Sequence, residues 1–80
     1  MLSELGTGKK VVGIKQSRKA IREGFAQKAY LAADADPKIR EELSELCRQE
    51  DIPLVTGMTM QELGKACGIE VGAAIAVVLG

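Results

Sequence analysis

The stretch AYLAADADPKIREELSELC, residues 29–47, contains a strand-like pattern followed directly by a helical one. Residues 29–33 are a continuous apolar run of strand length, which is typical of a strand buried on both faces. Asp36 is a preferred N-cap, and Pro37 suits the first helical turn because its missing N–H would be unpaired there anyway. Four apolar residues then recur at helical spacing and predict one buried stripe: Ile39, Leu43, Leu46 and Cys47.

Upstream of this unit, the sequence predicts a second strand and a second helix. Val11 and Val12 indicate a strand that ends at Gly13, and the pattern over residues 15–23 is helical. Gly24 is a natural C-terminal stop for that helix. The face expected to be buried consists of small and aliphatic residues: Ser17, Ala20, Ile21 and Gly24.

Downstream, residues 52–56 predict another strand, and Pro53 favours an edge strand or the start of a strand. Thr59 and Glu62 have the spacing of a capping box, and the helix that they begin is expected to end at Gly68. Its apolar face would be Leu63, Ala66 and Cys67. Residues 73–79 predict a last, buried strand. This alternation predicts an α/β protein, a three-layer α/β/α sandwich with a small central sheet of about four strands. We expect residues 1–80 to form one domain, and the pattern leaves open whether the sheet is wholly parallel.

Composition excludes several classes of function. The 80 residues include one Phe, one Tyr, no Trp and no His, so the core is aliphatic and the commonest general base and metal ligand are missing. Cys47 and Cys67 could form a disulfide on count alone. However, both occupy apolar positions of predicted helices, so we interpret them as small buried hydrophobic residues. We therefore expect no enzymatic activity, no catalytic residues, no cofactor and no metal site.

From the sequence we expect neither a signal peptide nor a membrane span. The apolar stretch over residues 71–79 is far shorter than the roughly 20 residues that span a bilayer, and no signal peptide opens the sequence. We expect a soluble, cytoplasmic protein with no membrane partner. Residues 6–10, GTGKK, are similar to a phosphate-binding loop. A Walker loop would need Gly in place of Ser3 and Ser or Thr in place of Lys10, so this interpretation fails.

Charge is unevenly distributed although the formal net charge is zero. Seven basic residues and one acidic residue, Glu23, lie between positions 9 and 28; the basic ones are Lys9, Lys10, Lys15, Arg18, Lys19, Arg22 and Lys28. Between positions 34 and 51, seven acidic residues outnumber Lys38, Arg40 and Arg48. A molecule polarised in this way can bind a polyanion with one end.

The segment GIKQSRK, residues 13–19, predicts the site of such binding. Gly13 allows a tight turn from strand to helix, which leaves the first helical amides unpaired beside the positive end of the helix dipole. At 100° per residue, four cations fall within about one third of the circumference: Lys15, Arg18, Lys19 and Arg22. Gln16 flanks them and carries a donor and an acceptor suited to a base edge. The alternative is an ordinary solvated basic face.

Three segments resemble one family of ribosomal proteins, that of L7Ae and L30e. They are GIKQSRK at residues 13–19, AADADP at 32–37 and LGKACGIEV at 63–71. The chain resembles this family along nearly its whole length, and in particular its short bacterial members of the YbxF type. The resemblance implies an α/β/α sandwich that binds the kink-turn, an RNA helix bent sharply at a three-nucleotide bulge beside tandem sheared guanine–adenine pairs.

The resemblance also implies which residues contact RNA. The segment that reads the major groove corresponds to residues 13–19, with Lys15-Gln16 in place of the usual Asn-Glu pair. An acidic residue that meets a flipped-out base corresponds to Asp36, and the loop over the bulged nucleotides to residues 57–60. The full predicted set is Gly13, Ile14, Lys15, Gln16, Arg18, Lys19, Asp36, Gly57, Met58, Thr59 and Met60. Met58 and Met60 could instead fill the core, and Asp36 caps a helix in any case.

The function predicted from these patterns is binding and stabilisation of a kink-turn in ribosomal or regulatory RNA by a monomer associated with the ribosome. The alternative is a scaffold module on the same fold, in which the acidic helix docks a protein partner. Salt dependence separates the two, because phosphate contacts make affinity fall steeply with salt concentration.

Overall fold

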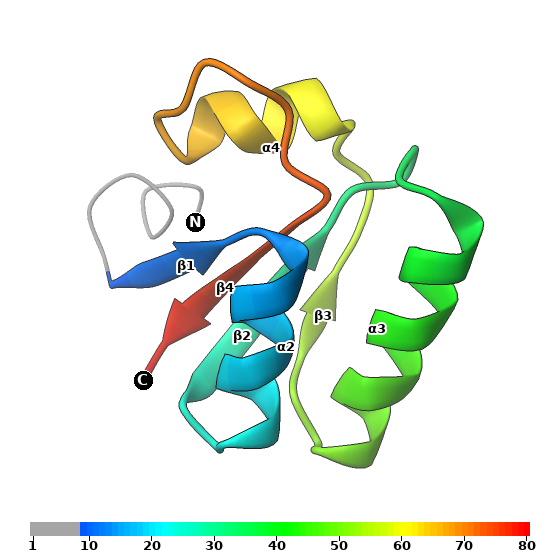
Figure 1. Ribbon diagram of the computed structural model, residues 1–80, viewed down its shortest axis with the longest axis vertical. Coiled ribbons are helices and arrows are strands. Elements are labelled where there is room, and N and C mark those ends of the chain that lie inside the picture. The colour runs from blue at the N-terminus through cyan, green and yellow to red at the C-terminus, as the bar shows by residue number, and fades with distance from the viewer. Residues whose placement is uncertain (1–8) are drawn as a thin grey trace.

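The computed structural model describes residues 9–80, which form a four-stranded mixed sheet and three helices (Figure 1). In chain order the elements are β1 (Lys10–Val12), α2 (Ile14–Arg22), β2 (Ala26–Leu31), α3 (Pro37–Gln49), β3 (Leu54–Val55), α4 (Met60–Ala66) and β4 (Ile75–Leu79). The strand order is β1-β4-β2-β3. β4 pairs antiparallel with both β1 and β2, whereas β2 and β3 are parallel, so the sheet is mixed.

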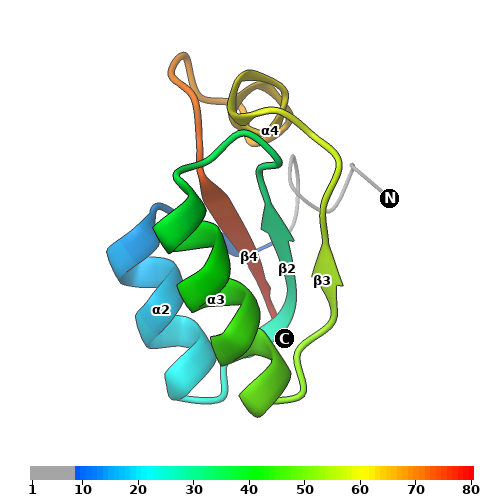
Figure 2. The same ribbon diagram turned by 90° about the vertical axis from the view of Figure 1, so that its right-hand side faces the viewer.

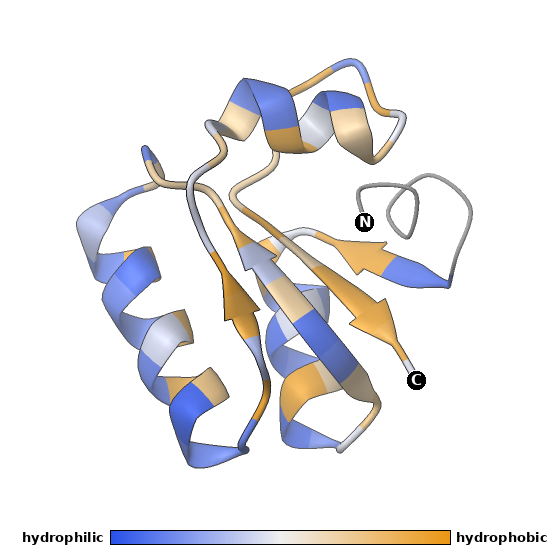
Figure 3. Ribbon diagram, turned by 180° about the vertical axis from the view of Figure 1, so that it is seen from behind, coloured by the Kyte–Doolittle hydropathy of each residue, from blue (hydrophilic) through white to orange (hydrophobic). Residues whose placement is uncertain are grey.

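The sheet separates two hydrophobic clusters, one shared with α2 and α3 and the other with α4. The helices on the two faces and the sheet between them form the predicted three layers. Successive residues of β2 and β4 alternate between the clusters, because side chains along a strand point to opposite faces. Ala29 and Leu31 join the cluster under α2 and α3, while Tyr30 joins the cluster under α4. Figure 2 shows α2 and α3 side by side on one face of the sheet. Figure 3 shows that the hydrophobic colour is concentrated in the strands, and that α3 is largely hydrophilic.

The helix predictions agree closely with the structure, and the strand predictions less so. β2 spans Ala26–Leu31, so the predicted limits of 29–33 were wrong at both ends. The apolar run missed the start of the strand, where Gln27 is exposed, and it continued past the end of the strand to Ala33, which is also exposed. β3 contains only Leu54–Val55 of the predicted residues 52–56, and it is an edge strand, as Pro53 indicates.

The two cysteines are buried and free, and the sheet lies between them. Cys47 belongs to the cluster under α2 and α3, and Cys67 to the cluster under α4. Burial raises the pKa of both thiols, because a thiolate is poorly solvated inside the protein. The interpretation as small buried hydrophobic residues is confirmed, and the disulfide is excluded by their separation.

Gly64 shows why the segment from Leu63 to Val71 packs so closely. A Cβ atom at Gly64 would lie 2.1 Å from the carbonyl oxygen of Val71, so a side chain there would displace backbone. The absence of a side chain at Gly64 therefore lets the loop after α4 lie directly against the helix.

Two further expectations concern the chain as a whole. Within residues 9–80, no helix combines the length and the apolar character needed to cross a membrane. The glycine-containing segment at residues 6–10 lies largely outside the described residues.

Candidate nucleic-acid interface

Strand direction brings the predicted site segments to one edge of the sheet. β1 and β2 are both antiparallel to β4, and β3 is parallel to β2, so the first three strands run in the same direction. The chain therefore leaves each of them at the same edge, which is also where β4 begins. This edge carries the start of α2, the residues 32–36 that precede α3, and the residues 56–59 that precede α4 (Figure 1).

Hydrogen bonds connect these segments to one another. The Gly13 amide donates to the Ile75 carbonyl at 3.2 Å, and the Ala33 amide donates to the Met58 carbonyl at 2.7 Å. The Asp34 side chain accepts a hydrogen bond from the Met60 amide at 2.7 Å. Asp34 thus joins the loop before α3 to the start of α4. Sequence reasoning missed this role, since the partners are 26 residues apart and nothing local indicates the contact.

Within residues 9–80, three helices begin at this edge, and α2 is the one among them that begins without a side-chain cap. The Asp36 carboxylate accepts a hydrogen bond from the Lys38 amide at the start of α3. Thr59 and Glu62 form the predicted capping box of α4, with side-chain to amide distances of 3.1 and 2.9 Å. α2 has Gly13 at its N-cap, with φ of 109° and no acidic residue in its first turn. Its first amides are therefore available to an anion.

The four predicted cations of α2 share one surface, which we call the basic stripe: Lys15, Arg18, Lys19 and Arg22. With Glu23 they line one shallow hollow. Lys15, Lys19 and Arg22 are exposed, while Ser17, Ala20 and Ile21 on the opposite face are buried. The predicted division of this helix into a basic face and a buried face is therefore correct.

Arg18 differs from the other members of the stripe because it forms an ion pair with α3. Its Nε lies 2.7 Å from Oε2 of Glu42, and its Nη2 donates to Oε1 of the same carboxylate at 3.1 Å. The sequence pattern groups Arg18 with the other three cations of α2 and does not indicate Glu42 as its partner. The pairing depends on the packing of α2 beside α3, which helical periodicity cannot report.

The loop of residues 57–60 lies at the same edge, and its two methionines are only half-buried. Both pack against the cluster under α4. A Cβ atom added at Gly72 would lie 3.3 Å from the Cβ of Met60, and the Met60 carbonyl accepts a hydrogen bond from the Ala73 amide, so Met60 has a clear part in holding the fold. Met58 also lines a shallow hollow with three residues of α4: Glu62, Lys65 and Ala66. Met58 is therefore the better placed of the two to contact a ligand.

Val71 is an exposed apolar side chain that does not belong to the predicted set of RNA-contacting residues. It is 71% exposed, in the loop between α4 and β4, which ends at the same edge of the sheet. Its position in a short loop with a glycine on either side, Gly68 and Gly72, is the signal that could have indicated exposure.

Comparison with known proteins gives a consistent picture. The chain matches the model of the "Ribosomal protein L7Ae/L30e/S12e/Gadd45 family" over residues 3–80. It is 41% identical to an RNA-binding protein of Geobacillus sp. (strain WCH70) over 75 residues, which cover 94% of this chain and 92% of that protein. It is 40% identical to the RNA-binding protein YbxF of Geobacillus stearothermophilus, with the same coverage.

Solved structures show the same fold. The Giardia lamblia 15.5kD RNA binding protein superimposes with a TM-score of 0.90 at 27% identity, covering 99% of this chain and 70% of that one. A protein of unknown function from Bacillus halodurans gives a TM-score of 0.89 at 26% identity, covering 99% and 83%. The names of these relatives describe RNA-binding proteins or no function, and none describes an enzyme. Because the family model matches residues 3–80, this chain belongs to the ribosomal protein L7Ae/L30e/S12e/Gadd45 family.

Proposed function

We propose that this protein binds RNA, and that its target is a kink-turn that it stabilises in the bent form. The observation that carries the proposal is the uncapped start of α2 beside three exposed cations: Lys15, Lys19 and Arg22. Open amides and clustered cations suit a phosphate backbone. The relatives named as RNA-binding proteins support the same conclusion.

The parts of this edge would have different roles. The amides at the start of α2, with Lys15 and Lys19, would hold phosphates and fix the register of the RNA. Gln16 is exposed in the first turn, where its amide can donate to and accept from a base edge. Asp36 would meet a flipped-out base, and the loop of residues 57–60 would cover the bulged nucleotides. The exposed side chain of Val71 would add an apolar surface for an unstacked base.

Binding of this kind acts on RNA by selecting one of its shapes. A protein can shift an RNA from extended to bent only by the difference between its affinities for the two forms. The edge presents contacts from α2, α3 and α4 together, and a straight duplex would reach only some of them. The kink-turn is therefore the form that we expect to be favoured.

The alternative function, docking of a protein partner on α3, has weaker support. Two of the three glutamates in the middle of that helix are already neutralised within the chain: Glu42 pairs with Arg18, and Glu45 pairs with Arg48. Glu41 is exposed and carries no such partner in the described part of the chain.

The test is a titration of the protein with three RNAs at several salt concentrations. The RNAs are a kink-turn, the same RNA with its sheared guanine–adenine pairs replaced by Watson–Crick pairs, and a straight duplex of similar composition. We expect the kink-turn to bind far more tightly than the other two, with affinity falling steeply as salt rises. Equal affinity for all three would contradict kink-turn recognition, and binding that is insensitive to salt would favour the scaffold.

The place of the protein in the cell belongs to the same proposal. We expect a cytoplasmic monomer associated with the ribosome through a kink-turn of ribosomal RNA. Crosslinking in cells followed by sequencing of the attached RNA would identify the target. Recovery of regulatory RNA without ribosomal RNA would contradict ribosome association and leave kink-turn binding intact.

A further inference from the structure

Glu42 holds one of the four cations of the basic stripe in an ion pair with one hydrogen bond. Nε of Arg18 lies 2.7 Å from Oε2 of Glu42, and Nη2 donates to Oε1 at 3.1 Å. The Arg18 side chain is 29% exposed and the Glu42 side chain 43% exposed, so the pair is partly withdrawn from solvent between α2 and α3. Water and salt screen such a pair less than they screen ions on an open surface.

The other three members of the stripe have no such partner. Lys15, Lys19 and Arg22 are exposed, and none of them forms an ion pair with another residue of the described chain, 9–80. The stripe therefore contains three cations open to solvent and one that a carboxylate already neutralises. The periodicity of α2 makes the four look equivalent, and the packing of α3 makes them different.

We propose that Glu42 acts as an internal counter-ion that keeps Arg18 away from RNA phosphates and thereby weakens sequence-independent RNA binding. The inference rests on the proposed function, since it concerns the same surface. A guanidinium binds carboxylate and phosphate with the same fork of donors, so the two anions compete for Arg18. A phosphate that took Arg18 would leave the Glu42 carboxylate unpaired and close to the RNA, and the two negative charges would repel.

The proposal makes Glu42 a residue that limits affinity, although it touches no RNA itself. Removal of its charge should release Arg18 as an additional phosphate contact. Affinity for a kink-turn and for a straight duplex should then rise by a similar factor, because a phosphate contact carries no sequence information. The dependence of log affinity on log salt should steepen by about 0.7 to 0.9, the contribution of one phosphate contact.

The experiment compares the full chain with four variants by titration of both RNAs over a range of salt. Glu42→Gln should bind both RNAs several-fold more tightly and with the steeper slope. Glu41→Gln is the matched control, because it removes the same charge from the neighbouring position without releasing Arg18. It should raise affinity less and leave the slope unchanged. The double variant Arg18→Gln/Glu42→Gln keeps the net charge of the native chain and should keep its slope.

Each result decides the proposal. A double variant with a slope flatter by about 0.7 to 0.9 would show that Arg18 already contacts a phosphate, which overturns it. Identical behaviour of Glu42→Gln and Glu41→Gln would also overturn it, because the gain would then come from net charge alone. Glu42→Ala should show the same rise in RNA affinity as Glu42→Gln, which excludes an effect of the glutamine side chain itself. Melting curves for all variants exclude misfolding as the cause. If the native protein binds RNA but the variants do not show the predicted changes in affinity and salt slope, only this inference is refuted. If the native protein binds no RNA, the proposed function is refuted as well.

Discussion

α2 and α3 are neighbouring helices on the same face of the sheet, and they begin at the same edge in opposite ways. α3 begins with Asp36, whose carboxylate occupies the Lys38 amide, and its middle turns carry glutamates. α2 begins with Gly13, no side-chain cap and no acidic residue, and its outer face carries cations. Two neighbouring helices of one layer can therefore differ at their N-termini: the start of α3 is closed, since a side chain caps it, and the start of α2 is open, since its first amides have no side-chain acceptor. A helix start that lacks a cap costs stability, and here the open amides coincide with the basic stripe.

The largest effect should follow from making the start of α2 resemble that of α3. Lys15→Glu places an acidic residue in the first turn and reverses a charge beside the open amides. We expect RNA affinity to fall on the order of a hundredfold at low salt, because a phosphate contact is replaced by repulsion. The melting temperature should stay the same or rise slightly, since an acidic residue near a helix N-terminus is favourable by roughly 0.3–1 kcal/mol.

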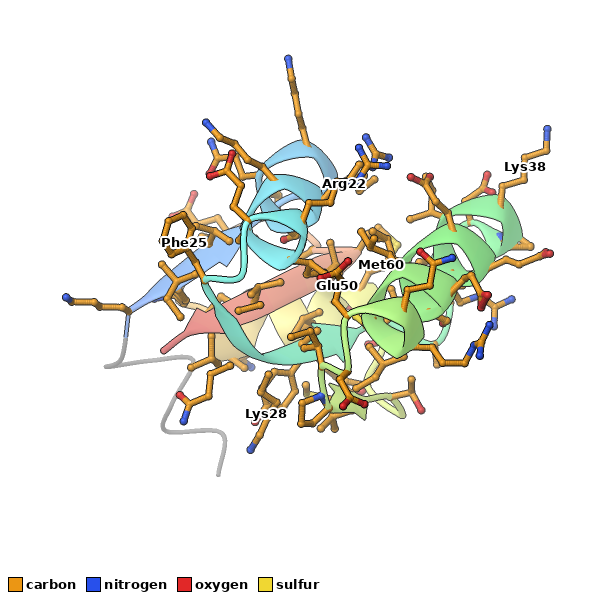
Figure 4. All side chains as sticks on the ribbon, turned by 90° about the horizontal axis from the view of Figure 1, so that it is seen from below. Arg22, Phe25, Lys28, Lys38, Glu50 and Met60 are labelled. Carbon is orange, nitrogen blue, oxygen red and sulfur yellow. The ribbon has the colours of Figure 1, made fainter. Side chains whose placement is uncertain are left out.

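Lys38→Glu is the control for that change. Lys38 is the second residue of α3, as Lys15 is of α2, and it extends from α3 away from the rest of the protein (Figure 4). The charge reversal is identical, but the start of α3 is already capped. RNA affinity should change far less. Equal losses in the two variants would mean that overall charge, and not the open helix start, governs binding.

The next effect concerns reading of bases at the open start. Gln16→Ala should cost roughly 1–3 kcal/mol on a kink-turn, the scale of a base-edge contact, and leave the salt slope nearly unchanged because no charge is lost. On an RNA whose sheared guanine–adenine pairs are replaced by Watson–Crick pairs, the loss should be much smaller. A protein–RNA double-mutant cycle measures the difference. Equal losses on both RNAs would mean that Gln16 does not contact the bases and that α2 binds only phosphates.

A smaller effect separates the two roles of Asp36 at the closed start. Asp36→Ala removes the cap of α3 and should lower the free energy of unfolding by about 1 kcal/mol, measured by denaturant titration. Asp36→Asn keeps a good cap and removes the charge, so its stability should be close to native. If the carboxylate also meets a base, Asp36→Asn should lose RNA affinity while remaining stable. Native affinity in Asp36→Asn would confine the role of this charge to the fold.

The smallest effect should come from one exposed cation of the stripe. Lys19→Ala should weaken binding to every RNA by a similar factor of a few-fold and flatten the salt slope by about 0.7 to 0.9, because a lysine ammonium is a point charge without shape preference. Lys38→Ala removes an exposed lysine of α3 that lines neither hollow of the proposed interface; it is the control and should change the slope little. A loss confined to the kink-turn would mean that Lys19 reads shape or sequence.

Local chemistry decided the parts of this protein that the sequence predicted well. The N-cap at Asp36, the capping box at Thr59 and Glu62 and the buried face of α2 depend on residues within one or two turns of each other. Such interactions can be predicted without knowledge of the fold, because periodicity and capping involve residues that are close together in the sequence. Strand limits were predicted less well, since the ends of β2 are set by pairing with β4 and not by the apolar run.

Only the tertiary structure decided which of the predicted residues meet. The parallel direction of β1, β2 and β3 brings the starts of three helices to one edge, and a contact over 26 residues of chain joins Asp34 to Met60. Packing of α2 against α3 places Glu42 on Arg18 and divides four similar cations into three open ones and one neutralised one. Sequence by itself determined the helices, their caps and the separation of a basic segment, residues 9–28, from an acidic one, residues 34–51. Charges interact through space, so the ion-pair partner of a residue depends on how segments distant in the sequence pack together. A local sequence pattern therefore cannot predict that partner.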